Sequence, residues 1–132
     1  MTFAATAIAV AYTGAEPVFM DYDPATGNLD PQLLQEALTA LRAEGADVVA
    51  VVPVDLLGRS VDYNRITAVT EEHGVPVISD AAESLGASHA GRPAGSFGLA
   101  AALSFNGNKI MTTSGGGMLL TDDASLADRV RS

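Results

Sequence analysis

The sequence contains no cysteine and no tryptophan, and only one of its 132 residues is lysine. Without cysteine the chain has no disulfide, no zinc–thiolate site and no cysteine nucleophile, which suits a cytoplasmic protein. Seven Lys and Arg stand against sixteen Asp and Glu, so the formal net charge is −9. Because proteins that bind nucleic acids need a cationic surface, this balance argues against a nucleic-acid partner. Hydrophobic residues make up 48% of the chain, enough for one domain with a core.

No hydrophobic run is long enough to cross a membrane, which takes about 20 apolar residues. The apolar N-terminal stretch, residues 1–12, also lacks the positively charged start of a secretory signal, because the first basic residue is Arg42. We interpret this stretch as a packed helix of small residues and expect no membrane association.

Helix signals recur along the chain. Asp30 followed by Pro31 is typical of a helix start, and Gly45 is typical of a helix end. Between them Leu34 and Leu38 belong to a single apolar face at helical spacing. Two more helices are expected, over residues 63–73 after the capping residue Asp62 and over residues 124–131 after Asp122 or Asp123.

Short apolar runs alternate with these helices. Strands are expected at residues 17–22, 48–54, 75–79, 99–105 and 118–121, with a helical turn at 81–87 and a loop at 89–97. This order predicts an α/β protein: an open, mostly parallel sheet flanked by helices on both faces.

Three polar residues follow or end predicted strands. Asp80 and Ser104 lie at strand ends, and Lys109 lies in the loop after Ser104. Ligands of parallel α/β sheets bind at the carboxyl ends of the strands. Taken singly, Asp80 is also a common helix cap and Lys109 an ordinary solvated lysine. Together, an amine and a carboxylate at a sheet edge suit a Schiff-base cofactor with a pyridinium nitrogen, and no metal site is expected.

Several stretches of the chain are similar to one enzyme family. The segments 2–7, 14–21, 80–87, 104–109 and 112–118 resemble, in this order, motifs of the DegT/DnrJ/EryC1/StrS aminotransferases. These are pyridoxal 5'-phosphate (PLP) enzymes of fold type I that act mostly on keto-sugars of nucleotide sugars. The resemblance implies that residues 1–132 are the central part of the PLP-binding large domain, without its N-terminal segment and C-terminal small domain. The absence of a C-cap at Ser132 and of a strand before the first helix fits this expectation.

The resemblance also implies roles for five residues. Lys109 matches the lysine that forms the internal aldimine and later moves the proton, and Asp80 matches the carboxylate facing the pyridine nitrogen. Ser104 matches a hydroxyl that holds the cofactor phosphate. Phe3 falls where an aromatic ring stacks on the pyridine, and Glu83 falls near the cofactor's 3-hydroxyl, where many members carry Gln or His.

One departure from the family pattern concerns the substrate. Asp55 stands where the family often has His, which implies a different substrate-side contact. The pattern around residues 106–117 looks most like members that aminate C4 of UDP-linked 4-keto-6-deoxy-N-acetylhexosamines. Lys109 implies transamination, because the relatives that dehydrate the sugar carry His in its place.

The resulting expectation is a PLP-dependent sugar aminotransferase that takes its amino group from an amino acid, expected to be glutamate. A homodimer or higher homo-oligomer is implied, since fold type I sites lie at a subunit interface, and the 132-residue chain alone is expected to be inactive. Two alternatives stay open: another fold type I PLP enzyme, such as a desulfurase, aldolase or amino-acid aminotransferase, and a catalytically inactive scaffold or dimerisation module.

Overall fold

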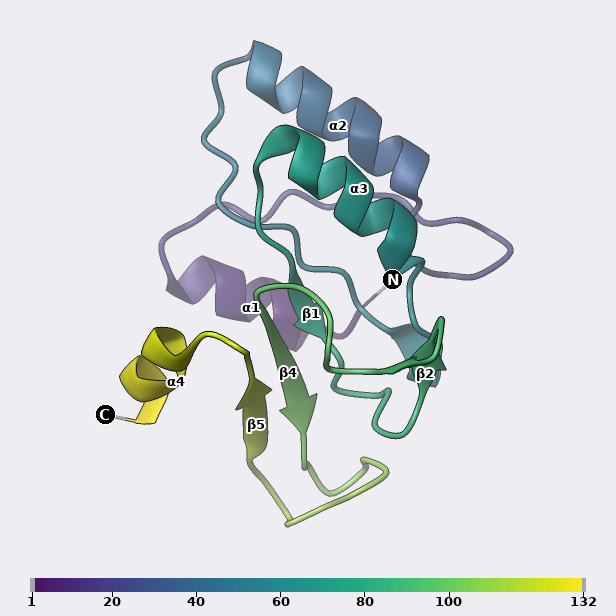
Figure 1. Cartoon of the computed structure of the whole chain (residues 1–132), viewed down its shortest axis with the longest axis vertical. Coiled ribbons are helices and arrows are strands. Elements are labelled where there is room, and N and C mark those ends of the chain that lie inside the picture. The colour runs from purple at the N-terminus through teal and green to yellow at the C-terminus, as the bar shows by residue number, and fades with distance from the viewer. Residues whose placement is uncertain (1, 132) are drawn as a thin grey trace.

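The computed structural model describes residues 2–131, so Met1 and Ser132, the outermost residues of the expected terminal helices, lie outside it. Helices α2 and α3 lie side by side at one end of the molecule, and the sheet β1-β4-β5 lies at the other (Figure 1). The elements are α1 (Ala4–Tyr12), α2 (Pro31–Ala43), the 3-10 turn η1 (Leu56–Gly58), α3 (Tyr63–His73), β1 (Ile78–Asp80), β2 (Ser88–His89), β3 (Arg92–Pro93), β4 (Ala100–Ser104), β5 (Gly117–Leu120) and α4 (Ala124–Arg131). None of the described helices is both long and apolar enough to span a membrane.

The helix starts predicted from the sequence are confirmed by their capping bonds. The side chain of Asp30 accepts a hydrogen bond from the Gln32 backbone at 2.7 Å, and that of Asp62 from the Arg65 backbone at 3.2 Å. Asp123, rather than Asp122, caps α4, where its carboxylate accepts from backbone N–H groups in the first turn. These bonds satisfy donors that have no partner within the helix, and so they set where each helix begins.

The sheet is mixed: its strands are parallel except for β5, the last strand in the order. Strand β1 pairs in parallel with β4, and β4 pairs antiparallel with β5. Residues 51–55 run along the other side of β1, bridged in parallel at Val51–Val77 and Val54–Asp80. The predicted α/β class is therefore confirmed, with one antiparallel strand at the edge.

The predicted strand at residues 48–54 is extended but not regular. Val51 donates to the Pro76 carbonyl, Ile78 to the Val51 carbonyl and Asp80 to the Pro53 carbonyl. A regular parallel ladder would have one more hydrogen bond between the second and the third of these, donated by the backbone of residue 53. This bond is missing because Pro53 has no N–H. The segment thus lies in the position of a parallel strand while a proline interrupts its hydrogen-bond ladder.

Two predictions near the N-terminus are wrong. Residues 17–22 form no strand, and Val18 and Phe19 are 59% and 73% exposed. The helix predicted at the start exists as α1, but none of its residues is buried, so it is not a packed helix. An apolar run becomes a strand only beside a partner, and in the described chain only Tyr22 of residues 17–22 is bridged, to Leu29.

Two other segments differ in detail from the prediction. Residues 81–87 form two successive turns and no helix, because only the Ser84 N–H to Ala81 carbonyl and Ala87 N–H to Ser84 carbonyl bonds form there. The predicted loop at residues 89–97 contains part of a short hairpin, in which β2 and β3 pair antiparallel.

The core lies between α2, α3 and the parallel strands. Its members are buried apolar side chains from these elements and the loops beside them: Leu34, Leu38, Val51, Val61, Tyr63, Ile66, Val77 and Phe97. Burial of these side chains is the main force that holds the carboxyl ends of the strands in place.

Gly98 is placed where no side chain fits. Its φ is +76°, and a Cβ there would lie 2.4 Å from the carbonyl oxygen of Val77. We expect Gly98→Ala to lower the free energy of unfolding by about 3 kcal/mol or more, since a left-handed conformation and a backbone clash add. The matched control is Gly45→Ala, with φ +78° but no atom within 4 Å, for which about 1–2 kcal/mol is expected. Denaturant unfolding measures both, and equal losses would show that the Val77 carbonyl moves aside.

Candidate active site

Three parallel segments end at one edge of the sheet. Residues 51–55 lead into η1, β1 ends at Asp80, and β4 ends at Ser104, before the loop that carries Lys109. In such sheets this edge is where ligands bind, because loops from neighbouring strands converge there. The sequence prediction that Asp80 and Ser104 lie at strand ends is therefore confirmed, and Lys109 lies in the loop after Ser104 as predicted.

Lys109 and Glu83 form an ion pair at this edge. The Lys109 Nζ lies 3.3 Å from Glu83 Oε1, with the lysine side chain 17% exposed and the glutamate side chain 32% exposed. The second carboxylate oxygen of Glu83 accepts a hydrogen bond from the Leu57 backbone at 2.9 Å. The Leu57 N–H, and after it the Lys109 ammonium, lower the pKa of Glu83. Glu83 thus presents a carboxylate that holds the only lysine of the chain.

Asp80 is held from a different element. Thr6 of α1 donates its hydroxyl to Asp80 Oδ2 at 2.6 Å, and the Ala82 backbone donates to Asp80 Oδ1 at 3.1 Å. The second bond is the capping contact considered as an alternative, so Asp80 supports the following turn and also faces α1. Sequence reasoning did not single out Thr6, although it belongs to the motif at residues 2–7.

Phe3 and Ser104 complete the predicted set. The Phe3 carbonyl accepts from the Thr6 backbone at 3.2 Å, so Phe3 lies one helical turn from the threonine that binds Asp80, and Phe3 is 79% exposed. The Ser104 hydroxyl accepts from the Asn106 backbone at 3.4 Å. Within residues 2–131 its own hydrogen is donated to no protein group, which leaves one donor for a ligand.

Asp55, which stands where the family often has His, lies in the interior. Its side chain is fully buried, and it accepts from the Val61 backbone at 3.0 Å and from the Ser84 hydroxyl at 2.9 Å. Burial raises the pKa of this carboxyl, an effect that the bonds from Val61 and Ser84 oppose. Asp55 is therefore part of the interior behind the site, and a substrate-side contact that differs from the family's stays a prediction.

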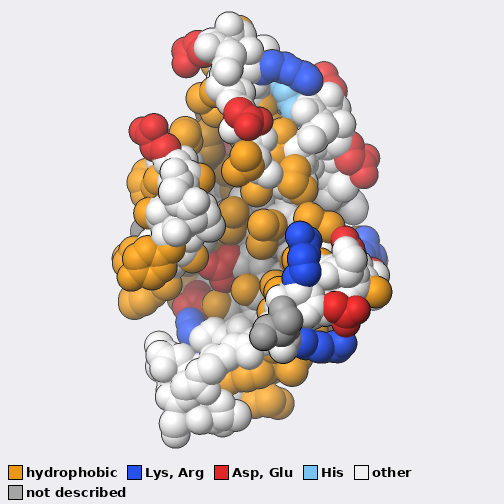
Figure 2. All heavy atoms as spheres, turned by 90° about the vertical axis from the view of Figure 1, so that its left-hand side faces the viewer, with side chains coloured by type: hydrophobic (Ala, Val, Ile, Leu, Met, Phe, Trp, Pro, Cys, Tyr) orange, Lys and Arg blue, Asp and Glu red, His pale blue; other side chains and the backbone are white. Residues whose placement is uncertain are grey.

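The side of the molecule that carries α1 and α4 is turned toward the viewer in Figure 2. Acidic and basic side chains lie there in a hollow bordered by hydrophobic ones. The hydrophobic border agrees with the exposed apolar side chains of Ile8 and Tyr12 on α1 and Val130 on α4. Charged groups set among apolar walls are typical of a ligand site.

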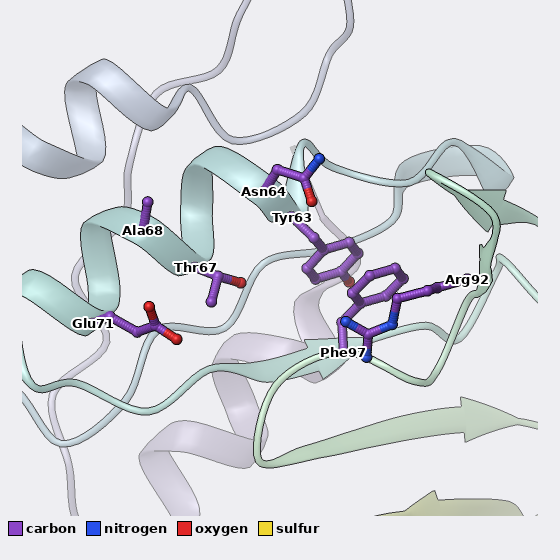
Figure 3. A pocket seen from close by; sticks show the side chains of 7 residues that line it. All are labelled: Tyr63, Asn64, Thr67, Ala68, Glu71, Arg92 and Phe97. Atoms are coloured by element: carbon purple, nitrogen blue, oxygen red, sulfur yellow. The ribbon is translucent and has the colours of Figure 1, made fainter.

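A separate pocket of about 230 Å³ lies beside α3 and β3 (Figure 3). The Tyr63 and Phe97 rings stack there with centroids 4.1 Å apart, and the Arg92 guanidinium lies 4.5 Å from the Phe97 centroid. None of the five predicted site residues lines it; its lining is Tyr63, Asn64, Thr67, Ala68, Glu71, Arg92 and Phe97. We call Asp80, Glu83, Ser104 and Lys109 the strand-end cluster. This cluster rather than the pocket is the candidate active site, because the cluster holds an amine paired with a carboxylate and the pocket lining does not.

The strand-end cluster suits a Schiff-base cofactor. Among residues 2–131 no three His, Asp or Glu side chains gather as metal ligands. The cluster offers an amine at Lys109, an anion at Asp80 for a ring nitrogen, and an unused hydroxyl donor at Ser104 for a phosphate oxygen. The residues present therefore fit PLP.

The chain belongs to the DegT/DnrJ/EryC1/StrS aminotransferase family, whose family model matches residues 1–132. It is 45% identical over 131 residues to the GDP-perosamine synthase of Caulobacter vibrioides, covering 99% of this chain and 34% of that protein. It is 42% identical to the UDP-2-acetamido-2-deoxy-3-oxo-D-glucuronate aminotransferase of Pseudomonas aeruginosa, covering 98% of this chain and 35% of that protein. The crystal structure of a DegT DnrJ EryC1 StrS aminotransferase from Brucella abortus matches with a TM-score of 0.95 and 45% identity, covering 99% of this chain and 36% of that one.

The chain spans about a third of the length of the curated relatives it matches. Aminotransferases of this family use pyridoxal phosphate, and solved structures of a Streptococcus pneumoniae relative, 26–28% identical to this chain, include PLP and PMP forms. These findings confirm the resemblance that the sequence motifs predicted.

Proposed function

We propose that residues 1–132 are the central part of the PLP-binding large domain of a nucleotide-sugar aminotransferase. The observation that carries this proposal is the pairing of the only lysine, Lys109, with Glu83 at the carboxyl edge of the sheet, next to Asp80 on the same turn. The amino donor is an amino acid, for which we propose glutamate. The working protein is a cytoplasmic homodimer or higher homo-oligomer.

Each of the five residues has a part in this proposal. When bound, PLP supplies an electron-accepting ring that weakens the Cα–H bond of the donor. Lys109 binds the cofactor through Nζ and afterwards carries a proton at the same atom. Glu83 orients Nζ, and Asp80, itself oriented by Thr6, supplies the negative charge at the ring nitrogen. Ser104 donates its hydroxyl to the phosphate, and Phe3 offers its exposed ring as a stacking surface.

The substrate class follows from the named relatives. Two proteins that are 42–45% identical to this chain carry names that refer to sugars on GDP and on UDP. We therefore propose a keto-sugar of a nucleotide sugar as amino acceptor, in particular C4 of a UDP-4-keto-6-deoxy-N-acetylhexosamine. Other fold type I reactions and a purely structural role remain the alternatives that an assay separates.

A substrate panel tests the proposal. The complete protein that carries this chain is loaded with PLP and given glutamate with 4-keto and 3-keto sugars on UDP, GDP and TDP. We expect 2-oxoglutarate to form beyond one equivalent per cofactor only when a keto-sugar nucleotide is present, most rapidly with the UDP-4-keto substrate. Formation of sulfide from cysteine, or amino transfer to 2-oxo acids alone, would assign another fold type I reaction, and no turnover with any substrate would support the scaffold alternative.

A further inference from the structure

Asp55 lies where two loops that border the candidate site meet. Its Oδ1 accepts from the Val61 backbone at 3.0 Å, which closes the loop that contains η1. Its Oδ2 accepts from the Ser84 hydroxyl at 2.9 Å, and its backbone N–H donates to the Asp80 carbonyl at 3.0 Å. One fully buried residue therefore holds both ends of the turn from Asp80 to Ser84 as well as the neighbouring loop.

The two loops meet again at the site itself. The Leu57 N–H donates to Glu83 Oε2, and Glu83 Oε1 lies against Lys109 Nζ. Leu57 adopts φ +53°, a left-handed conformation that is costly for a leucine and persists only where the surroundings impose it. A Cβ on Gly58 would lie 3.2 Å from the Glu83 carbonyl oxygen, so the loops are also in close contact there.

We propose that Asp55 and Ser84 form a clamp that positions Glu83 against Lys109, which makes both of them positioning residues. The inference rests on the proposed function, in which the Glu83–Lys109 pair belongs to the catalytic site. Without the Ser84–Asp55 bond, the turn that carries Glu83 is free to move relative to the loop that carries the Leu57 N–H. The clamp thereby determines how firmly Glu83 holds its two partners.

The clamp depends on hydrogen bonding rather than on negative charge. In Asp55→Asn the amide oxygen still accepts from Val61, and the amide nitrogen donates to the Ser84 oxygen. The Ser84 proton then turns to the Ala81 carbonyl, which already lies 3.4 Å from Ser84 Oγ. The titratable groups that face Asp55 are Tyr63 and Asp80.

The test uses Ser84→Ala in the cofactor-free protein, so its outcome is independent of the amino-transfer assay. The pKa of Glu83 is measured by NMR of a ¹³C-carboxyl-labelled sample, and hydrogen exchange is measured at the Leu57 amide. We expect the pKa of Glu83 to rise toward that of an ordinary glutamate, and Leu57 exchange to become about fivefold faster, the effect of losing one hydrogen bond. Asp55→Asn should keep both values close to those of the unmodified protein.

Thr70→Val is the matched control. Thr70 also carries a buried hydroxyl, but this hydroxyl donates to the Thr67 carbonyl within α3 and not to the clamp. It should lose stability without moving either Glu83 or Leu57. If Ser84→Ala fails to fold, Ser84→Cys, which keeps the volume with a weaker donor, takes its place. Unchanged Glu83 and Leu57 values in the Ser84 variant, or equal changes in Thr70→Val, would overturn the proposal.

Discussion

Replacement of Lys109 by alanine is expected to abolish amino transfer, with a loss of turnover of about a thousandfold or more. The reason is that one atom, Nζ, both binds the cofactor and carries the proton, and a positioned proton carrier alone contributes about 10²–10⁴-fold. Borohydride reduction of the PLP-loaded protein should attach a pyridoxyl label to a single internal peptide. That peptide is expected to contain Lys109, the only lysine among residues 1–132. Turnover and peptide mass spectrometry measure the two effects.

Lys109→Arg is the control for charge. A guanidinium can keep the ion pair with Glu83, which lies 3.3 Å from the lysine nitrogen, but it does not act as the amine nucleophile. We expect Lys109→Arg to be folded, inactive and unlabelled. A label found only on an amine other than Lys109, or substantial turnover in either variant, would contradict the assignment of Lys109.

Asp80→Asn is expected to lower turnover by about a hundredfold or more while the fold is retained. The amide keeps the size of the side chain; its oxygen can accept the hydrogen bond from the Ala82 backbone, and its nitrogen can donate to the Thr6 hydroxyl oxygen in place of the bond that Thr6 donates to Asp80. It lacks the negative charge that stabilises a protonated ring nitrogen, and a preorganised electrostatic contact of this kind is worth about 10²–10³-fold. Turnover is compared with the free energy of unfolding of the same variant.

Asp62→Asn separates this effect from loss of a helix cap. Asp62 caps α3 through the Arg65 backbone and lies outside the strand-end cluster. Because asparagine caps helices about as well as aspartate, both stability and turnover should stay near those of the unmodified protein. If Asp80→Asn also retained near-normal turnover, Asp80 would be a capping residue only.

The sequence predictions were correct where the interactions join residues close together in the chain, and they failed where the interactions join distant residues. Asp30 and Asp62 were recognised as caps, and the third cap was narrowed to Asp122 or Asp123, because a cap binds a backbone N–H only two or three residues away. The strand at residues 17–22 was wrong because a strand needs a partner that apolar composition does not reveal. Pro53 shows the same limit, since its effect on the ladder depends on which side of the segment faces β1.

The members of the candidate site stay a prediction, while their contacts come from the structure alone. The motifs pointed to Lys109, Asp80, Glu83, Ser104 and Phe3; the structure pairs Lys109 with Glu83, places Asp80 and Ser104 at strand ends, and places Phe3 one helical turn from Thr6. The burial of Asp55 could not be read from its position in a motif. The contacts of Thr6 with Asp80 and of Leu57 with Glu83 join residues 74 and 26 positions apart.

The sequence by itself determined the α/β class, the starts of α2, α3 and α4, the single lysine and the family motifs, because these depend on local periodicity, capping and composition. Only the tertiary structure decided that Glu83 holds Lys109, that Thr6 holds Asp80 and that Asp55 lies buried behind both. The physical reason is that these contacts arise where strands from distant parts of the chain end side by side. Their hydrogen bonds form only after the core between α2, α3 and the strands has brought those ends together.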